Sequence, residues 1–386
     1  MFKPSRRILL SALGGGVALV GAGAAWRVTR VPHKAVVPWN LETGPLRDIR
    51  LEAFRHAILA PNPHNRQPWQ IRLLGDNEAI VTCDLERRLP ETDPFDRQIT
   101  IGFGAFIELA AIAAAERGYE ARITPFPEGA PGEGARLDRR PILHVRFQRD
   151  DSIAKDPLFA WITRRRSSKL PYDMSRPVPK DVLSKLSGEA GGMMRFGHAV
   201  EADVAARLRD LAGRAMVLEL ETPHTLKESI DIARVGAAEI DANPDGISLQ
   251  GPLFEALGLL GSDSVRKQAL DPSSNAYRSA MARFARMFAA TPAFFWLVSQ
   301  GNTRAEQVEA GRRYVRLNLA ANALGLSVNP VSQALQEYPE MRAHFAAMHA
   351  ICGAKGQERV QMLARLGYAD PVGPSPRWPL GAKLVA

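Results

Sequence analysis

Residues 104–118 read GAFIELAAIAAAERG, and residues 311–325 read GRRYVRLNLAANALG. In each segment two glycines stand fourteen residues apart and enclose a run that is rich in alanine. The first run is apolar on nearly every side, which is typical of a buried helix. Small residues also let two backbones approach closely. We therefore predict two helices, at about 103–117 and 310–324, that pack against each other at the centre of the molecule.

The similarity between the two segments extends beyond their glycines. An arginine precedes the first glycine by seven residues in each case, at Arg97 and at Arg304. At matched offsets Ile112 aligns with Leu319. Chance matches between alanine-rich helices are common, but a true repeat would make the chain two copies of one unit. We expect an α+β fold in which two fused halves form an internal pseudo-dimer, with helices packed on mixed sheets.

Composition excludes several classes of function. The chain has 386 residues and a formal charge of +9, and it is long enough for one large or two ordinary domains. No basic run is interleaved with aromatic residues, so we expect no nucleic-acid partner. The eight histidines are scattered, and Cys83 and Cys352 form no CxxC pair, so we expect no metal site. The sequence leaves open whether the two cysteines form a disulfide.

The first 24 residues have the pattern of an export signal. Arg6 and Arg7 precede a Gly/Ala-rich apolar run, which ends in the small-x-small pattern of Ala22-Gly23-Ala24. The arginine pair resembles a twin-arginine signal. An ordinary secretory signal and an uncleaved membrane anchor are the alternatives. We therefore expect an exported, periplasmic protein, either released or anchored through this segment.

The remainder divides into a linker and two halves. We predict the linker at 25–45 and the first half at 46–150. By periodicity and turn signals the first half carries a helix at about 47–60 and strands at about 69–74, 79–84, 119–125 and 142–148.

The second half is predicted at 151–386 and contains a helical, lid-like insertion near 218–290. After the insertion we expect a strand over PAFFWLVSQ (292–300) and a loop over 325–342. Two further helices are predicted before the proline-rich tail.

A stretch dense in amide side chains follows the first helix. Residues 60–69 read APNPHNRQPW, and prolines with asparagines often form an ordinary loop. Asn65 and Gln67 each carry amide donors and an acceptor. If the segment is extended, both face one side. Such a pair suits a flat heterocycle that bears carbonyls and ring nitrogens.

Two basic features are candidates for binding an anion. RRRSSK at 164–169 is either a solvated helix end or a phosphate clamp, because guanidinium groups match phosphate oxygens bidentately. Arg377 lies in an otherwise uncharged tail, PVGPSPRWPL. Most surface arginines bind nothing, but prolines would fix the direction in which Arg377 points.

Together these pieces resemble the nitroreductase-like flavoprotein family. The resemblance rests on PNPHNRQPW, RRRSSKLPYDMSRPVPKDVL, GLSVNPVSQ and LGYADP with a late arginine, and it covers about 45–380. It is greatest to the Acg-type branch, in which two nitroreductase-like halves are fused in one chain. The resemblance implies FMN, bound noncovalently where the halves meet, and a monomer that acts as a pseudo-dimer.

The resemblance also implies the roles of particular residues. It assigns the phosphate-binding turn to Arg165, Ser167 and Lys169, and a late phosphate contact to Arg377. It assigns Asn65 and Gln67 as amides that approach the flavin from the partner half, and Asn329 and Pro330 as the loop beside the flavin ring. No side chain is assigned as catalytic, since flavin N5 carries the chemistry. Each half keeps part of a site, which implies one FMN per chain. In Acg-type proteins such an insertion can cover the flavin, which disfavours large substrates.

Three functions remain open at this stage. An oxidoreductase would pass electrons through the flavin to a small acceptor, such as a quinone or a nitro compound, from an unknown donor that could be a membrane quinol or a partner protein. A storage protein would hold FMN behind the insertion with little turnover. A structural or interaction protein would have lost the flavin.

Overall fold

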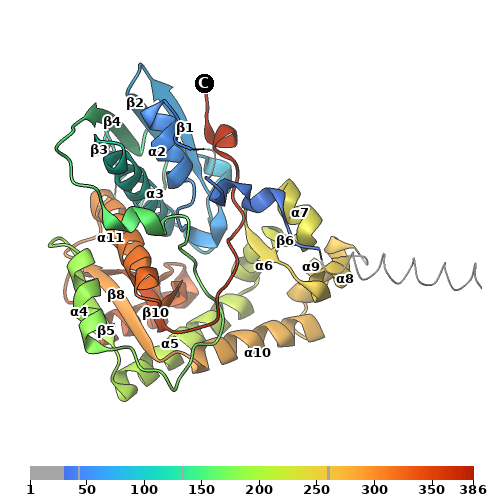
Figure 1. Ribbon diagram of the computed structural model, residues 1–386. Coiled ribbons are helices and arrows are strands. Elements are labelled where there is room, and N and C mark those ends of the chain that lie inside the picture. Colours follow the sequence, from blue (N-terminus) through green and yellow to red (C-terminus); the bar gives the residue numbers. More distant parts are fainter. Residues whose placement is uncertain (1–29, 42–43, 133, 259–260) are drawn as a thin grey trace, which may run out of the picture.

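The computed structural model describes residues 30–41, 44–132, 134–258 and 261–386. The predicted export signal, with Arg6 and Arg7, lies outside them. The described structure contains two four-stranded sheets and a small parallel sheet of two strands, β6 (Ala233–Val235) and β7 (Ile247–Leu249). Two long helices, α3 and α11, lie between the two larger sheets (Figure 1). Shorter helices cover the second sheet on its far side, and the tail runs from the second half back to the first (Figure 1).

The first sheet has the order β1-β2-β4-β3. Its strands pair antiparallel throughout, and their bounds are Trp69–Leu74, Glu78–Cys83, Tyr119–Pro125 and Leu143–Arg149 for β1 to β4. Two helices pack on this half, α2 (Ile49–Ala57) and α3 (Arg97–Glu116). A short 3-10 helix, η3 (Leu85–Arg87), follows β2.

The second sheet has the order β5-β8-β10-β9 and is also antiparallel. Its strands are β5 (Arg195–Ala199), β8 (Ala293–Ser299), β9 (Ser327–Pro330) and β10 (Arg359–Gly367). The half begins with η4 (Pro157–Trp161) and α4 (Lys180–Glu189) and contains α11 (Arg304–Ala323). Between β9 and β10 lie η5 (Gln333–Leu335), η6 (Pro339–Met341) and α12 (Arg342–Ile351).

The two halves share one topology. Each runs strand, strand, long helix, strand, strand, and each sheet places the last strand between the second and the third. The expected α+β fold of two fused halves is therefore confirmed. The expected mixed sheets are wrong for both four-stranded sheets. Every pair of neighbouring strands in these two sheets is antiparallel.

The central contact between α3 and α11 confirms the prediction made from the glycines. A Cβ atom on Gly104 would lie 1.9 Å from the carbonyl oxygen of Val308, and one on Gly311 would lie 1.8 Å from that of Ile101. The two contacts are related by the same offset as the two glycines, so each half meets the other in the same way. Only glycine allows this approach at either position.

The interrupting insertion lies between β5 and β8, where the first half has only the tight β1–β2 turn. It therefore spans 200–292 and starts earlier than residue 218. Its elements are α5 (Ala202–Glu221), α6 (Pro223–Asp231), β6 (Ala233–Val235), α7 (Gly236–Ala242), β7 (Ile247–Leu249), α8 (Pro252–Gly258), α9 (Ser262–Leu270) and α10 (Asn275–Ala289). In Figure 1 these helices lie at the right and along the bottom.

The segment before the tail differs from the sequence prediction. A single helix, α12, precedes it, and the second predicted helix is instead β10, which lies inside the sheet. Its residues have good helix propensity, but pairing with β8 and β9 on both edges outweighs that preference. Residues 327–330, predicted as loop, form the edge strand β9.

The two ends of the described chain return to the first half. Lys34–Trp39 forms a 3-10 helix, η1, within the region predicted as a linker. The tail contains η7 (Leu380–Lys383), and Leu384 forms a parallel bridge with Ile71 of β1. The end of the tail thus packs on β1, whereas η1 contacts the insertion and the tail.

Two further features concern location and redox state. Within the described ranges only α3 is long and apolar enough to cross a membrane, and 83% of its most apolar window is buried inside the protein. Cys83 and Cys352 are both buried and free, so they form no disulfide. Burial raises the pKa of both thiols, to about 12 for Cys352.

Candidate functional site

The amide-rich stretch 60–69 forms a tight turn. Pro63–Asn65 forms a 3-10 helix, η2, and His64, Asn65 and Gln67 have φ values of 45°, 53° and 50°. The extended conformation predicted for this stretch is therefore wrong. Asn tolerates left-handed backbone, and the surrounding contacts hold the other two residues there.

Gln67 is fully buried, and its amide is used within the protein. Its Nε2 donates to the carbonyl of Pro244 in the insertion at 2.7 Å, and its Oε1 accepts from the Trp378 amide at 2.9 Å. Lys383 Nζ donates to its backbone carbonyl at 2.7 Å. Gln67 therefore ties the insertion and the tail to the first half through the same amide that the resemblance assigns to the flavin.

Arg165, in the basic turn, is only 2% exposed, which excludes a solvated helix end at this position. Its Nη1 donates to Asn318 Oδ1 at 3.0 Å and to Ser167 Oγ at 3.3 Å. Its Nη2 donates to the Leu59 carbonyl at 3.1 Å. Its Nε has no partner.

Arg377, in the tail, reaches the same place from the other side and is also 2% exposed. Its Nη1 donates to Asn65 Oδ1 at 2.6 Å, and its Nη2 donates to the carbonyls of Leu59 and Ala60 at 3.1 and 3.0 Å. Its Nε has no partner. The structure thus brings together Arg165, Arg377 and Asn65, which lie far apart in the sequence.

The two guanidinium groups share an acceptor but have no counter-ion. Across the described residues, neither Arg165 nor Arg377 forms an ion pair with a carboxylate. Burial lowers the pKa of Arg165 to about 10, and burial together with the charges of Arg165 and Arg166 lowers the pKa of Arg377 well below its ordinary value. Both Nε atoms are buried donors without acceptors. This arrangement fits a site that an anion would complete.

Helix α11 supplies two asparagines that hold the basic turn. Asn318 accepts from Arg165, and its Nδ2 is a further buried donor without a partner. One turn later Asn322 Oδ1 accepts from the Arg166 backbone amide at 2.8 Å. The sequence reading overlooked this pair. Two asparagines at i and i+4 in an alanine-rich helix were the available signal.

Ser167 and Lys169 continue the turn. Lys169 is accessible to solvent, yet burial by surrounding protein lowers its pKa. Lys169 also acts on His64 of the amide-rich turn, because burial, and then the charges of Lys169 and Arg66, lower the pKa of His64 to about 4. At neutral pH His64 is therefore uncharged, while the turn keeps its positive charge.

Asn329 and Pro330 lie on β9, next to the basic turn. The Ser168 amide donates to the Val328 carbonyl at 3.0 Å, which fixes the turn against this strand. Asn329 is 4% exposed, and its Oδ1 has no hydrogen-bond partner. The predicted ring-side loop therefore offers one unused acceptor beside the predicted phosphate turn.

The insertion contributes its own residues. Glu219 of α5 is 3% exposed, and its Oε2 accepts from Gln336 Nε2 at 2.7 Å. Burial raises the pKa of Glu219 to about 7, and the charge of Lys169 opposes this rise. Asp245 is paired with Arg87 and accepts from Trp378 Nε1. The insertion thus contacts the first half, the tail and the neighbourhood of the turn.

Similarity to known proteins can now be set beside this geometry. No family model matches the chain. The chain is similar over 83% of its length to nitroreductase-like proteins of Mycobacterium tuberculosis. One, named "Putative NAD(P)H nitroreductase Rv3131", is 25% identical over 339 residues, which is 86% of its own length.

Two further relatives and one solved structure match parts of the chain. The M. tuberculosis Acg protein is 29% identical over 126 residues, covering 32% of this chain and 36% of its own length. The uncharacterized M. tuberculosis protein Rv3127 is 31% identical over 140 residues, covering 33% of this chain and 39% of its own. The crystal structure of the FMN- and NADPH-dependent nitroreductase NfnB from Sphigopyxis sp. strain HMH aligns with 59% of this chain and 97% of its own, at 16% identity and a TM-score of 0.36. A TM-score this low does not establish a shared fold.

Proposed function

We propose that the chain is an FMN-dependent oxidoreductase of the nitroreductase-like class, which passes electrons to a small acceptor such as a quinone or a nitro compound. One observation carries the proposal. Arg165 and Arg377 are buried together without a carboxylate, and each keeps an unused Nε donor. Burial of two unpaired cations costs stability, and a phosphate group would offset that cost.

The residues fit the rest of FMN as well. Ser167 Oγ lies beside Arg165, and Asn318 Nδ2 is a spare buried donor for phosphate oxygens. Lys169 would add a positive charge to the phosphate-binding turn, and Asn329 Oδ1 is a buried acceptor that could receive an N–H group of the flavin. The flavin, when bound, supplies the redox chemistry at N5. The chain binds, orients and shields it.

The relatives suggest the electron donor. The name of the Rv3131 protein includes NAD(P)H. We propose a nicotinamide donor if the protein acts where that cofactor is abundant, and a quinol or partner protein if it is exported.

Storage of FMN is the second candidate, and contacts of the insertion favour it. Gln67 Nε2 donates to Pro244 O, and the Gly246 amide donates to Asn65 O at 3.2 Å, so the loop of the insertion is fastened to the site turn. A fastened cover would exclude large acceptors. Storage and catalysis share the cofactor and differ in turnover.

One experiment separates these functions. The absorption spectrum of the purified protein should show oxidised flavin, and a colourless protein that also fails to bind added FMN would overturn both candidates. Flavin reduced with dithionite is then mixed with a benzoquinone or a nitroarene under anaerobic conditions. Repeated turnover supports the oxidoreductase, whereas a reduced flavin that neither acceptor reoxidises supports storage.

Location is a separate proposal. We propose export through the twin-arginine route, on the basis of Arg6 and Arg7 before an apolar run. Replacement of both arginines by lysine should leave the protein in the cytoplasm. Normal export of this double variant, measured by cell fractionation, would indicate the general secretory route.

A further inference from the structure

The 3-10 helix η1, which precedes the first half, is hydrogen-bonded to two distant parts of the chain, the tail and the insertion. Trp39 Nε1 donates to the Ser375 carbonyl at 2.7 Å, and the Ala35 carbonyl accepts from the Arg377 amide at 2.8 Å. The Ala35 amide donates to Asp241 of the insertion at 2.9 Å. A segment that the sequence presented as a linker is therefore a built part of the site.

Trp39 is buried at the meeting point of the site arginines. The guanidinium carbons of Arg166, Arg377 and Arg165 lie over its ring, at 4.8, 5.3 and 5.7 Å from the ring centre. The ring is 7% exposed. Three cations from two separate segments thus share one aromatic ring, with no carboxylate among them.

An aromatic face suits this position better than a carboxylate would. Its quadrupole attracts cations, which reduces the repulsion among the three guanidinium groups. A guanidinium over a ring uses its face for that contact and keeps its N–H donors free in its own plane. A carboxylate would instead occupy the donors that a phosphate needs.

We propose that Trp39 is a positioning residue for the anion site: its ring holds Arg165, Arg166 and Arg377 in place, so that their donors are set for a phosphate group before it binds. The identity of the ligand as FMN rests on the proposed function, whereas the binding of an anion at this site does not. Preorganised donors bind more tightly because less ordering is left to do on binding.

Two substitutions separate the ring from the bulk of the side chain. Trp39→Phe keeps a π face and loses the bond to Ser375, whereas Trp39→Leu keeps apolar bulk and loses both. The matched control is Trp161→Leu, because Arg164 lies over the Trp161 ring at 5.6 Å, outside the anion site. The measurements are titrations of each apoprotein with FMN and with riboflavin, and thermal unfolding with and without inorganic phosphate.

We expect Trp39→Leu to weaken FMN about tenfold and Trp39→Phe about threefold, with riboflavin affinity changed less than about twofold in both. Trp161→Leu should match the parent. Equal loss of FMN and riboflavin affinity in Trp39→Leu, or no loss of either, would overturn the proposal.

The unfolding measurements with inorganic phosphate test the role of Trp39 independently of the proposed FMN function. If the parent binds no flavin, but phosphate raises its melting temperature more than that of Trp39→Leu or Trp39→Phe, the FMN function fails and the role of Trp39 stands. If phosphate stabilises parent and both variants equally, the role of Trp39 fails whatever the cofactor proves to be.

Discussion

Two of the regions in which this protein buries arginines differ in how the buried charge is compensated. At the junction of the halves, Arg97 and Arg304 stand at the starts of the central helices. At the anion site, Arg165 and Arg377 stand on a turn and on the tail. All four are at most 7% exposed. The regions differ in what surrounds each guanidinium group.

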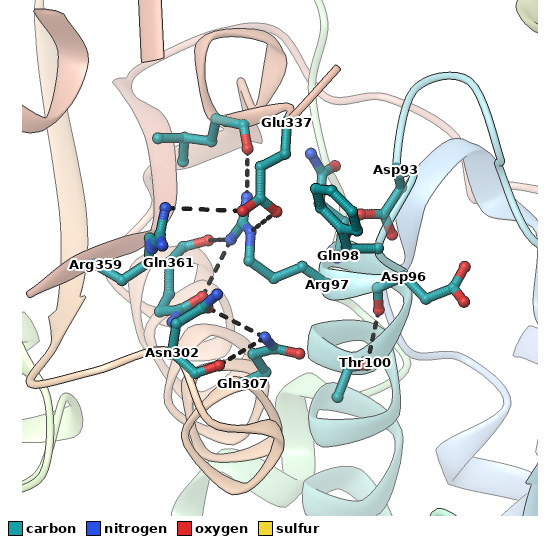
Figure 2. Close-up of polar contacts among 12 residues, drawn as sticks. Asp93, Asp96, Arg97, Gln98, Thr100, Asn302, Gln307, Glu337, Arg359 and Gln361 are labelled. Atoms are coloured by element: carbon teal, nitrogen blue, oxygen red, sulfur yellow. Dashed lines mark hydrogen bonds and ion pairs between the residues drawn. The ribbon is translucent and has the colours of Figure 1, made fainter. Parts of the chain in front are cut away.

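At the junction the buried charge is satisfied within the protein. Arg97 Nε pairs with Glu337 at 3.0 Å, while its other nitrogens donate to Gln361 and to the Leu335 carbonyl (Figure 2). Arg304 crosses the other way and donates to first-half groups, including the Thr100 hydroxyl at 3.1 Å. Each half thus donates one arginine to the other.

At the anion site each arginine donates to at least one backbone carbonyl, one amide oxygen and one serine hydroxyl, and neither arginine forms an ion pair with a carboxylate of the described residues. The two sites bury the same chemical group at similar depth. The difference teaches that burial of arginine does not by itself mark a ligand site. Within the described residues Arg304 forms no ion pair either, but it has no buried nitrogen without a partner, whereas Arg165 and Arg377 lie together and each keeps an unused Nε donor.

The largest expected effect tests the junction. Gly104→Ala places a methyl group against the Val308 carbonyl, which neither backbone can avoid without separating the helices. We expect a loss beyond the usual ~1–3 kcal/mol for overpacking, and no soluble folded protein. Gly213→Ala on α5 is the control, because its Cβ would meet Phe288 at an ordinary 3.8 Å. A folded Gly104→Ala variant, by circular dichroism and gel filtration, would contradict the central contact.

Two methionine variants test whether the arginines of the junction and of the anion site differ in their contribution to stability. Arg97→Met leaves Glu337 without its partner and should lower the free energy of unfolding by about 3 kcal/mol. Arg165→Met removes a cation that has no counter-ion and should change it by no more than about 1 kcal/mol in the apoprotein. Urea unfolding measures both. An equal loss in the two variants would make Arg165 a structural arginine.

Substitution of the anion-site arginines should affect FMN affinity more than it affects stability. Charge-assisted hydrogen bonds contribute about 1.5–3 kcal/mol each, so Arg165→Ala and Arg377→Ala should each weaken FMN about ten- to a hundredfold and reduce its preference over riboflavin. Arg164→Ala is the control, since Arg164 is exposed on the same turn. Unchanged FMN binding by Arg165→Ala in titrations would place the flavin elsewhere.

Glu219 tests whether Lys169 of the basic turn has a buried counter-ion. Its pKa of about 7 lies above the ordinary 4.5, so the folded state keeps a proton that the unfolded state releases, and its contribution to stability is lost as pH rises from about 4.5 to 7. Between pH 5 and pH 8 the parent should lose about 2 kcal/mol more than Glu219→Gln. Parallel pH profiles of urea midpoints would mean that Glu219 is ionised and serves as a counter-ion.

The smallest effect concerns Asn65. From the sequence this residue was expected on the ring side, where its loss would spare the preference for FMN over riboflavin. The structure places its Oδ1 on Arg377 at 2.6 Å, so Asn65→Ala should act through that arginine. We expect FMN to weaken about fivefold, near 1 kcal/mol, with a reduced preference over riboflavin. If the preference stays intact while FMN weakens, Asn65 contacts the ring.

The parts of the fold that local sequence encodes were predicted well. The paired Gly-to-Gly segments identified α3, α11 and their contact, because only a close helix crossing requires glycine at both places. The strands of the first half followed from alternation. β10 was missed, because its residues suit a helix in isolation and only the neighbouring strands make it a strand.

The candidate site divides in the same way. Residue types alone singled out Arg165 and Arg377 as cations that match phosphate. Nothing in the sequence indicated that Trp39, in a segment predicted as a linker, lies beside them. Gln67 matched by type and spacing but is occupied by the tail and the insertion. A sequence pattern indicates which polar side chains are available for a ligand, but it does not show which of them already have hydrogen-bond partners within the protein.

The sequence by itself thus determined the two-half α+β architecture, the buried helix pair and a supply of cations for an anion, since these depend on local spacing and residue chemistry. Only the tertiary structure decided which cations remain without counter-ions. That depends on where distant acids and acceptors come to lie: Arg377 meets Leu59 and Asn65 across more than 300 residues of chain, while Arg97 meets Glu337. Charge compensation is a property of spatial neighbours, and folding chooses those neighbours.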